Sequence, residues 1–180
     1  MMKRLCLAAT AAVAMCLPLA RAEAAPQPTP QSVAHLELAQ MMGRWYEVAR
    51  VPNVIQNGCQ AGASDWVAQS WGFAVVQSCH KGGPDGPVSV WKAKATVADP
   101  ATNAKFRMSF FGGVVTQNYV VIEHRPDQGW LALATADGKY LWLMSQKPTL
   151  PAPVRAQAVA RIRQLGFDVN RLEFPQPAHG

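Results

Sequence analysis

Met42-Gly43-Arg44-Trp45-Tyr46-Glu47-Val48-Ala49-Arg50 is the stretch that decides the fold of this chain. Gly43 permits a tight backbone turn where a strand begins. Two residues later on the same strand face, the indole of Trp45 can fill one end of a closed sheet. A Gly-X-Trp alone is a weak signal. Its interpretation therefore depends on its position, its flanks and the rest of the chain.

Residues 1–24 are predicted to be a cleavable signal peptide. Lys3 and Arg4 precede an apolar run over residues 5–19, and Ala-X-Ala cleavage options follow within residues 20–24. Pro18 and the small residues of this run argue against a permanent transmembrane helix, which needs about 20 apolar residues without such breaks. We therefore expect an exported protein, periplasmic or secreted.

Cys16 leaves a second form of export open, an outer-membrane lipoprotein anchored through this cysteine. Signal peptidase II prefers a small residue directly before its cysteine, and Met15 fits that preference poorly. Soluble export is the prediction, and the lipid anchor is the alternative.

The charge of the mature chain excludes a basic surface of the kind that binds nucleic acids. Removing residues 1–24 takes three of the 17 basic and one of the 11 acidic residues, so the net charge falls from +6 to +4. This charge is mild and not clustered. It is compatible with peripheral contact to an anionic membrane surface. Residues 25–35 are a stiff Pro-rich spacer, and residues 36–177 are long enough for one domain with a sizeable core.

Cys59 and Cys79 are the two cysteines outside the signal peptide. In an oxidising compartment an isolated pair indicates a disulfide. A redox or metal pair would be expected to show Cys-X-X-Cys spacing, and this spacing is absent.

Short alternating segments separated by turn residues predict an all-β fold. We expect eight strands, at residues 43–51, 62–70, 73–80, 89–98, 104–111, 118–124, 129–135 and 139–146. Eight antiparallel strands that close on themselves leave an interior just wide enough for one small ligand. Apolar residues then recur at helical spacing over 154–166, which predicts one C-terminal helix packed outside the barrel.

Taken together, these motifs resemble those of the bacterial, outer-membrane type of lipocalin over residues 36–177. Besides the first strand, the matching stretches are Lys105-Phe106-Arg107-Met108-Ser109-Phe110-Phe111, Tyr119-Val120-Val121-Ile122, Lys139-Tyr140-Leu141-Trp142-Leu143-Met144-Ser145 and Gly166-Phe167-Asp168-Val169. The resemblance implies an eight-stranded antiparallel up-and-down barrel. It also implies a protein that binds and carries a hydrophobic ligand, a fatty acid or lysophospholipid, in envelope lipid storage or transport.

The same resemblance assigns Gly43, Trp45, Glu47 and position 146 to the base of the barrel. The family usually has an arginine after the eighth-strand motif, where it stacks over the first-strand tryptophan. Gln146 stands there in this chain, and an amide cannot supply the cation–π attraction. Base closure is therefore expected to be weaker, or to use another basic residue.

Alternation assigns strand faces only up to a choice of phase. With Trp45 taken as inward, Glu47 and Ala49 share its face, and Trp130, Ala132 and Ala134 form an inward set on the seventh strand. The predicted ligand-binding residues are Trp66, Val75, Gln77, Ala93, Ala95, Phe106, Met108, Phe110, Tyr119, Trp130 and Trp142. For any one of them, simple core packing is an equally good explanation. Arg50, Lys94, Lys105 and Arg107 could meet an anionic head, although charged residues at strand ends are more often only solvated.

Two other classes of function stay open from the sequence. A lipid-modifying enzyme on the same barrel would need an unpaired Cys59 or Cys79 facing the cavity. A protein-interaction module would use loops 52–62 and 81–88 and have a filled interior. No histidine, cysteine or carboxylate pattern indicates a catalytic or metal site, so we expect a binding protein that is not an enzyme and has no cofactor. The oligomeric state is not predicted.

Overall fold

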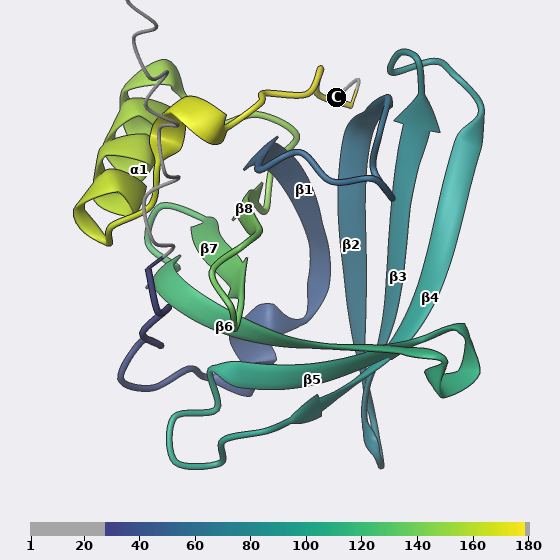
Figure 1. Cartoon of the computed structure of the whole chain (residues 1–180), viewed down its shortest axis with the longest axis vertical. Helices are drawn as coiled ribbons and strands as arrows, with labels where there is room; N and C mark the ends of the chain where they lie inside the picture. Colours follow the sequence, from purple (N-terminus) through teal and green to yellow (C-terminus); the bar gives the residue numbers. More distant parts are fainter. Residues whose placement is uncertain (1–27, 179–180) are drawn as a thin grey trace, which may run out of the picture.

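Eight strands connected in sequence order form a closed antiparallel barrel (Figure 1). The structure is a computed structural model that describes residues 28–178, so the predicted signal peptide and Cys16 lie outside the described residues. The strands are β1 (Gly43–Arg50), β2 (Cys59–Gln69), β3 (Gly72–Lys81), β4 (Val88–Val97), β5 (Lys105–Phe110), β6 (Val115–Arg125), β7 (Trp130–Thr135) and β8 (Leu141–Ser145).

Short helices flank the barrel strands. They are the 3-10 helices η1 (Leu38–Met41), η2 (Phe111–Gly113) and η3 (Val169–Arg171), and the α-helix α1 (Ala152–Gln164). The barrel closes because β1 pairs with β2 along one edge and with β8 along the other. The predicted fold class is confirmed, including the single C-terminal α-helix outside the sheet.

The barrel has two distinct ends. At the closed end, η1 enters just before β1 begins, and Leu36 and Met41 pack into the inner core. At the open end lie the connections β1–β2, β3–β4, β5–β6 and β7–β8 (Figure 1). This polarity follows from the antiparallel order, since every odd-numbered strand runs from the closed end to the open end.

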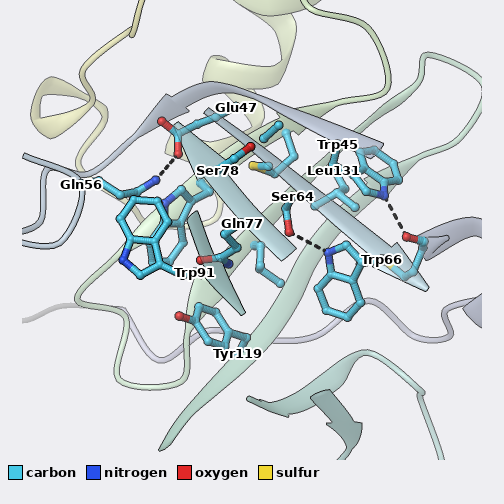
Figure 2. A pocket seen from close by; sticks show the side chains of 15 residues that line it. Trp45, Glu47, Gln56, Ser64, Trp66, Gln77, Ser78, Trp91, Tyr119 and Leu131 are labelled. Atoms are coloured by element: carbon cyan, nitrogen blue, oxygen red, sulfur yellow. Dashed lines mark hydrogen bonds between the residues drawn. The ribbon is translucent and has the colours of Figure 1, made fainter. Parts of the chain in front are cut away.

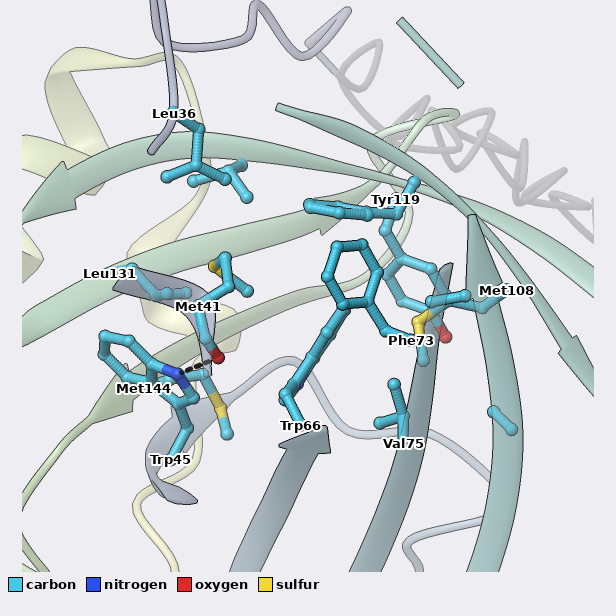
Figure 3. Close-up of a cluster of buried hydrophobic side chains, with 14 of the residues drawn as sticks. Leu36, Met41, Trp45, Trp66, Phe73, Val75, Met108, Tyr119, Leu131 and Met144 are labelled. Carbon is cyan, nitrogen blue, oxygen red and sulfur yellow. Dashed lines mark hydrogen bonds between the residues drawn. The ribbon is translucent and has the colours of Figure 1, made fainter. Parts of the chain in front are cut away.

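The inner core lies inside the barrel and includes Leu36, Met41 and Trp45 of the closed end (Figure 3). Three of its aromatic rings, Trp66, Phe73 and Phe106, contact one another with centroid separations of 5.3–6.0 Å. Tilted and edge-on pairs of this kind add to the free energy gained by burial. Because side chains fill much of this end, most of the room for a ligand lies nearer the open end.

A second core lies outside the barrel, beneath α1. Ala158 and Ile162 of α1 are buried there against residues from β1, β6, β7 and β8. Trp130, Ala132 and Ala134 belong to this outer core, as do Val48 and Ala49. The prediction that Trp130, Ala132, Ala134 and Ala49 face the cavity is therefore wrong. The inward residues of β7 are Leu131 and Leu133, which line the cavity instead.

Two bulges change which face of a strand is presented. In β1 the pairing with β8 shifts between Glu47 and Ala49, so that Val48 is an extra residue. Beyond the shift, Arg50 pairs with Trp142, which faces inward. A bulge places two residues opposite one and reverses the face on which the next residues of the strand lie. It therefore places Arg50 on the same inner face as Glu47, which a regular strand would not do.

The bulge in β6 has the same effect near the closed end. The pairing with β7 shifts between Val121 and Glu123. His124 then pairs with the inward Leu131, while Glu123 faces α1 and its Oε2 accepts a 2.5 Å hydrogen bond from Arg161.

Candidate functional site

Trp45 closes one end of the barrel, as predicted. Its side chain is 1 % exposed, and its indole nitrogen donates a 3.0 Å hydrogen bond to the Met41 carbonyl of η1. The ring beside it belongs to His124, in an edge-on contact at 6.4 Å between centroids. Burial lowers the pKa of His124, so the imidazole packs there as a neutral ring.

Gly43 and Gln146 also lie at this end. Gly43 has φ of 91°, which favours glycine, and it begins β1. Gln146 is exposed after β8, and its backbone N–H donates to the Gly129 carbonyl. The ring contact at Trp45 therefore comes from His124, on a strand that the sequence reasoning did not consider for this place.

Above the closed end lies an inner chamber with a cavity volume of about 60 Å³ (Figure 2). Its lining combines aromatic, aliphatic and polar side chains: Met41, Trp45, Glu47, Gln56, Ala63, Ser64, Trp66, Gln77, Ser78, Trp91, Tyr119, Leu131, Leu133, Trp142 and Met144. A void needs roughly 10–15 Å³ on the same measure to hold one water. The inner chamber therefore has room for a group of a few heavy atoms.

An outer chamber of about 150 Å³ lies beside it, toward the open end. The two share five lining residues, Gln56, Gln77, Trp91, Tyr119 and Trp142. The remaining outer residues come from the open-end connections and the strand ends beside them: Asn53, Val54, Ile55, Phe110, Phe111, Val115, Gln117, Thr135 and Tyr140. Val54 and Phe111 are 87 % and 57 % exposed, so apolar side chains surround the entrance.

Glu47 and Gln56, which line one side of the inner chamber, belong to a buried ion-pair network. The guanidinium of Arg50 donates to one carboxylate oxygen of Glu47, and the Gln56 amide donates to the other at 2.6 Å. The same guanidinium forms an ion pair with Glu173 at 2.5 Å and donates to the Cys59 carbonyl at 2.9 Å. Two carboxylates therefore share one buried guanidinium.

Gln56 links this network to the aromatic wall. Its side-chain oxygen accepts a 2.8 Å hydrogen bond from the Trp142 indole and a 2.7 Å bond from the Asn53 amide. The ring of Trp142 lies 5.7 Å from that of Tyr119, measured between centroids. The Gln56 side chain thereby links the β1–β2 connection to the cavity wall.

Gly62 of β2 makes room for the carboxyl group of Glu47. A Cβ at position 62 would lie 3.1 Å from Glu47 Cβ and Cδ. Burial is the largest influence on Glu47 and raises its pKa, although Arg50 and the Gln56 hydrogen bond lower it. Burial also raises the pKa of Tyr119 to about 12. The Tyr119 hydroxyl in the cavity is therefore neutral at physiological pH.

The predicted ligand-binding residues divide into three groups. Trp66, Gln77, Phe110, Tyr119 and Trp142 line the two chambers. Val75, Ala93, Ala95, Phe106 and Met108 face inward but are packed into the inner core below the chambers. Trp130 lies outside, as described above. Contact of the lining residues with a ligand stays a prediction.

The positions of Glu47 and of the four candidate cations also differ from the predictions. Glu47 lines the chamber and is held by Arg50 and by the open-end connection, so the prediction that it belongs to the base is wrong. Lys94 lies over the exposed Trp71, Lys105 pairs with Asp99, and Arg107 is exposed. None of the four predicted cations lines either chamber.

Sequence reasoning missed several lining residues. Gln56 lies in an irregular connection, where no period assigns a direction to its side chain. Trp91 shares a strand face with Ala93 and Ala95 of β4, so alternation could have added it to the predicted ligand-binding residues. Ser64 lies two residues before Trp66, on the same face, and accepts a 3.0 Å hydrogen bond from its indole.

The predicted disulfide is confirmed. Cys59 at the start of β2 is bonded to Cys79 near the end of β3, with 5.4 Å between their Cα atoms. It ties two neighbouring strands at the open end. The enzyme alternative loses its nucleophile, because both cysteines of the described region are committed to this bond. Among residues 28–178, no group of three or more His, Cys, Asp or Glu side chains could hold a metal ion.

Comparison with known families agrees with this architecture. The model of the lipocalin-like domain matches residues 36–177, most of the chain. The chain belongs to the lipocalin family. Members of the family bind small hydrophobic ligands, and this is the class of ligand that the assignment supports for the chain.

Relatives of this lipocalin include envelope proteins. It is 28 % identical to the outer membrane lipoprotein Blc of Vibrio cholerae, over 80 % of this chain and 84 % of that protein. It is 26 % identical to Blc of Escherichia coli K12, over 80 % and 81 %, and 26 % identical to temperature-induced lipocalin-1 of Arabidopsis thaliana, over 78 % of each. None of these names is that of an enzyme, in agreement with the predicted binding protein.

Solved structures show the same fold. Insecticyanin from the tobacco hornworm Manduca sexta superposes with a TM-score of 0.67 at 16 % identity, covering 84 % of this lipocalin and 85 % of that chain. At this identity the likeness concerns the fold alone. Within residues 28–178 of the lipocalin, none of the helices has the length and apolar character that crossing a bilayer requires.

Proposed function

We propose that this lipocalin binds and carries a single-chain lipid, a fatty acid or a lysophospholipid, in the cell envelope. The observation that supports this proposal is the pair of adjacent chambers, the outer of which opens between the β1–β2 connection and η2. An acyl chain gains about 0.8 kcal/mol for each methylene it buries. A chain that follows the outer chamber would lie among aromatic and aliphatic side chains for most of its buried length.

The interior argues against the interaction-module alternative. That alternative requires a filled barrel, whereas the cavity here continues inward to Trp45. The open-end loops could still contact a membrane while a lipid enters or leaves, since apolar residues surround the entrance.

Native mass spectrometry of the full chain exported to a bacterial periplasm tests the proposal. We expect an adduct with the mass of a fatty acid or lysophospholipid that disappears after organic extraction. The extracted protein should then take up a fluorescent fatty acid. A protein that carries no adduct and takes up no added lipid would refute lipid carriage.

A pair of tryptophan variants locates the ligand. Trp91 lines both chambers, whereas Trp71 is exposed at the β2–β3 turn of the closed end. Trp91→Phe should weaken lipid binding by about tenfold, as expected when one aromatic contact in an enclosed site is reduced. Trp71→Phe should leave it unchanged. Equal effects of the two variants would mean that the lipid binds elsewhere.

Location in the envelope is supported by the two bacterial relatives, whose names place them in the outer membrane. The mass of the mature protein distinguishes the two forms of export. Cleavage near residue 24 gives an unmodified chain, whereas the lipoprotein form begins at a diacylated Cys16. We expect the unmodified chain.

A further inference from the structure

We propose that the cavity takes its lipid head first, with a positively charged ammonium group in the inner chamber and the acyl chain in the outer one. The inference rests on the proposed lipid carriage and narrows its ligand class. It selects a lysophospholipid whose head ends in an amine or quaternary ammonium over a free fatty acid.

The charge of the lining is the first reason. Among the described residues that line the two chambers, Glu47 is the one with an ionisable acid, and no lysine or arginine is present. The inner chamber also has the more polar surface of the two, and the outer one is mainly apolar. A carboxylate head placed inside would meet no cation, whereas an ammonium head would meet an acid.

The ion-pair network does not cancel this preference. Arg50 neutralises one carboxylate, but both Glu47 and Glu173 contact it, so the ionised cluster carries a net charge of −1. Each carboxylate oxygen can accept more than one hydrogen bond. Glu47 accepts a single bond at each oxygen from the described residues. It retains acceptor capacity toward the chamber that it lines.

The aromatic wall is the second reason. Trp91, Trp142 and Tyr119 line the inner chamber beside Gln77, and Figure 2 shows Glu47, Gln77, Trp91 and Tyr119 around the same space. Faces of aromatic rings attract cations, and enclosed aromatic cages are used to recognise quaternary ammonium groups. The inner chamber, at about 60 Å³, suits the four heavy atoms of a trimethylammonium group better than an acyl chain.

Lys81 supplies a positive charge for the phosphate of such a zwitterionic head. It ends β3 at the open end, where its Nζ lies 6.0 Å from the centroid of the Trp91 ring and donates to the Asn57 carbonyl at 2.8 Å. In a zwitterionic head the phosphate follows the ammonium by two carbons. With the ammonium inside Trp91, the phosphate would lie on the side of the ring nearer the entrance, within the field of Lys81.

Binding of three dodecyl amphiphiles tests the inference. Dodecylphosphocholine, dodecyltrimethylammonium and dodecanoate share one chain and differ in the head. Their dissociation constants would be measured by tryptophan fluorescence below the concentrations at which they form micelles. We expect both ammonium compounds to bind about tenfold more tightly than dodecanoate.

Variants identify the residues responsible. Glu47→Gln should remove most of the preference for the ammonium compounds, whereas Asp127→Asn, at an exposed turn of the closed end, removes the same charge and should preserve it. Gln77 lines both chambers and is outside the ion-pair network. Gln77→Glu should therefore increase the preference and Gln77→Lys should reverse it, even if Glu47→Gln fails to fold.

The outcomes separate this inference from the proposal on which it rests. Dodecanoate binding as tightly as the ammonium compounds, with affinity lost in Lys81→Gln and unchanged by the Gln77 pair, would mean that the head stays at the entrance. That result would overturn the inward ammonium head and leave lipid carriage intact. Failure of all three amphiphiles to bind would overturn lipid carriage itself.

Discussion

Arg50 is buried between two carboxylates, and its removal would leave Glu47 without a compensating charge. Breaking a buried pair by deleting one partner costs about 3–5 kcal/mol, because the remaining charge is not solvated. We expect Arg50→Met to lower the free energy of unfolding by about this amount in urea titrations. Arg44→Met removes a half-exposed pair with Asp65 and should cost less than about 1 kcal/mol. Similar effects for the two variants would contradict the buried network.

The raised pKa of Glu47 makes the stability of the network depend on pH. The folded chain keeps the proton of the Glu47 carboxyl to a higher pH than the unfolded chain does. In the unfolded chain the pKa of this carboxyl is the ordinary 4.5. The stabilising contribution is therefore complete below pH 4.5 and is lost as the pH rises through the folded pKa.

Urea titrations at several pH values test the direction of this pH dependence. Relative to Glu47→Gln, the wild-type free energy of unfolding should fall as the pH rises from 4.5 toward neutrality. A wild-type advantage that grows with pH over that range would mean that Arg50, and not burial, dominates the environment of Glu47.

At the scale of the element, the strands with one polar face were predictable and β7 was not. Along β4, Lys92, Lys94 and Thr96 alternate with Trp91, Ala93 and Ala95, so the inward face follows from the sequence alone. Residues 130–134 are apolar throughout, because β7 is covered by the inner core on one face and by α1 on the other. Because polar and apolar residues do not alternate along β7, the sequence could not show which residues face inward. Trp130 was therefore predicted to face the cavity, whereas it faces the outer core.

The helix α1 stabilises the barrel through a narrow contact. Ala158 and Ile162 are its buried residues. Ile162→Ala should lower the free energy of unfolding by about 2–5 kcal/mol, the range for large-to-small changes in a core. Arg163→Ala, one residue further and exposed, should change it by less than about 0.5 kcal/mol. Denaturant titrations of both variants test whether the outer core contributes to global stability or only to the attachment of α1.

For the whole molecule, the barrel was predictable because it depends on a pattern spread over many residues. The disulfide was predictable because Cys59 and Cys79 are the two cysteines outside the predicted signal peptide. The cavity was only partly predictable. Its charged wall depends on the bulge in β1 and on Gln56 in an irregular connection, and neither feature has a periodic signal. The inner core also occupies more of the barrel than expected, which is why Phe106 and Met108 are core residues.

The Cys59–Cys79 disulfide should be a major contributor to the stability of the whole barrel. It encloses a loop with a sequence separation of 20, and restricting the unfolded chain in this way stabilises by roughly 3 kcal/mol. A reductant should lower the midpoint of urea unfolding of the wild-type protein. The double variant Cys59→Ala with Cys79→Ala should be equally unstable with and without reductant. A wild-type midpoint unaffected by complete reduction would show that the bond adds nothing.

The extra residue in β1 has a consequence for how this protein is compared and altered. If Val48 were paired as an ordinary strand residue, no charge, no hydrogen-bonding side chain and no large ring would be lost, yet Arg50 would turn away from Glu47. The ion pair thus depends on the bulge between its two members and not only on their identities. A homologue that keeps both residues and their spacing in a regular strand would keep the sequence of this site and lose its chemistry.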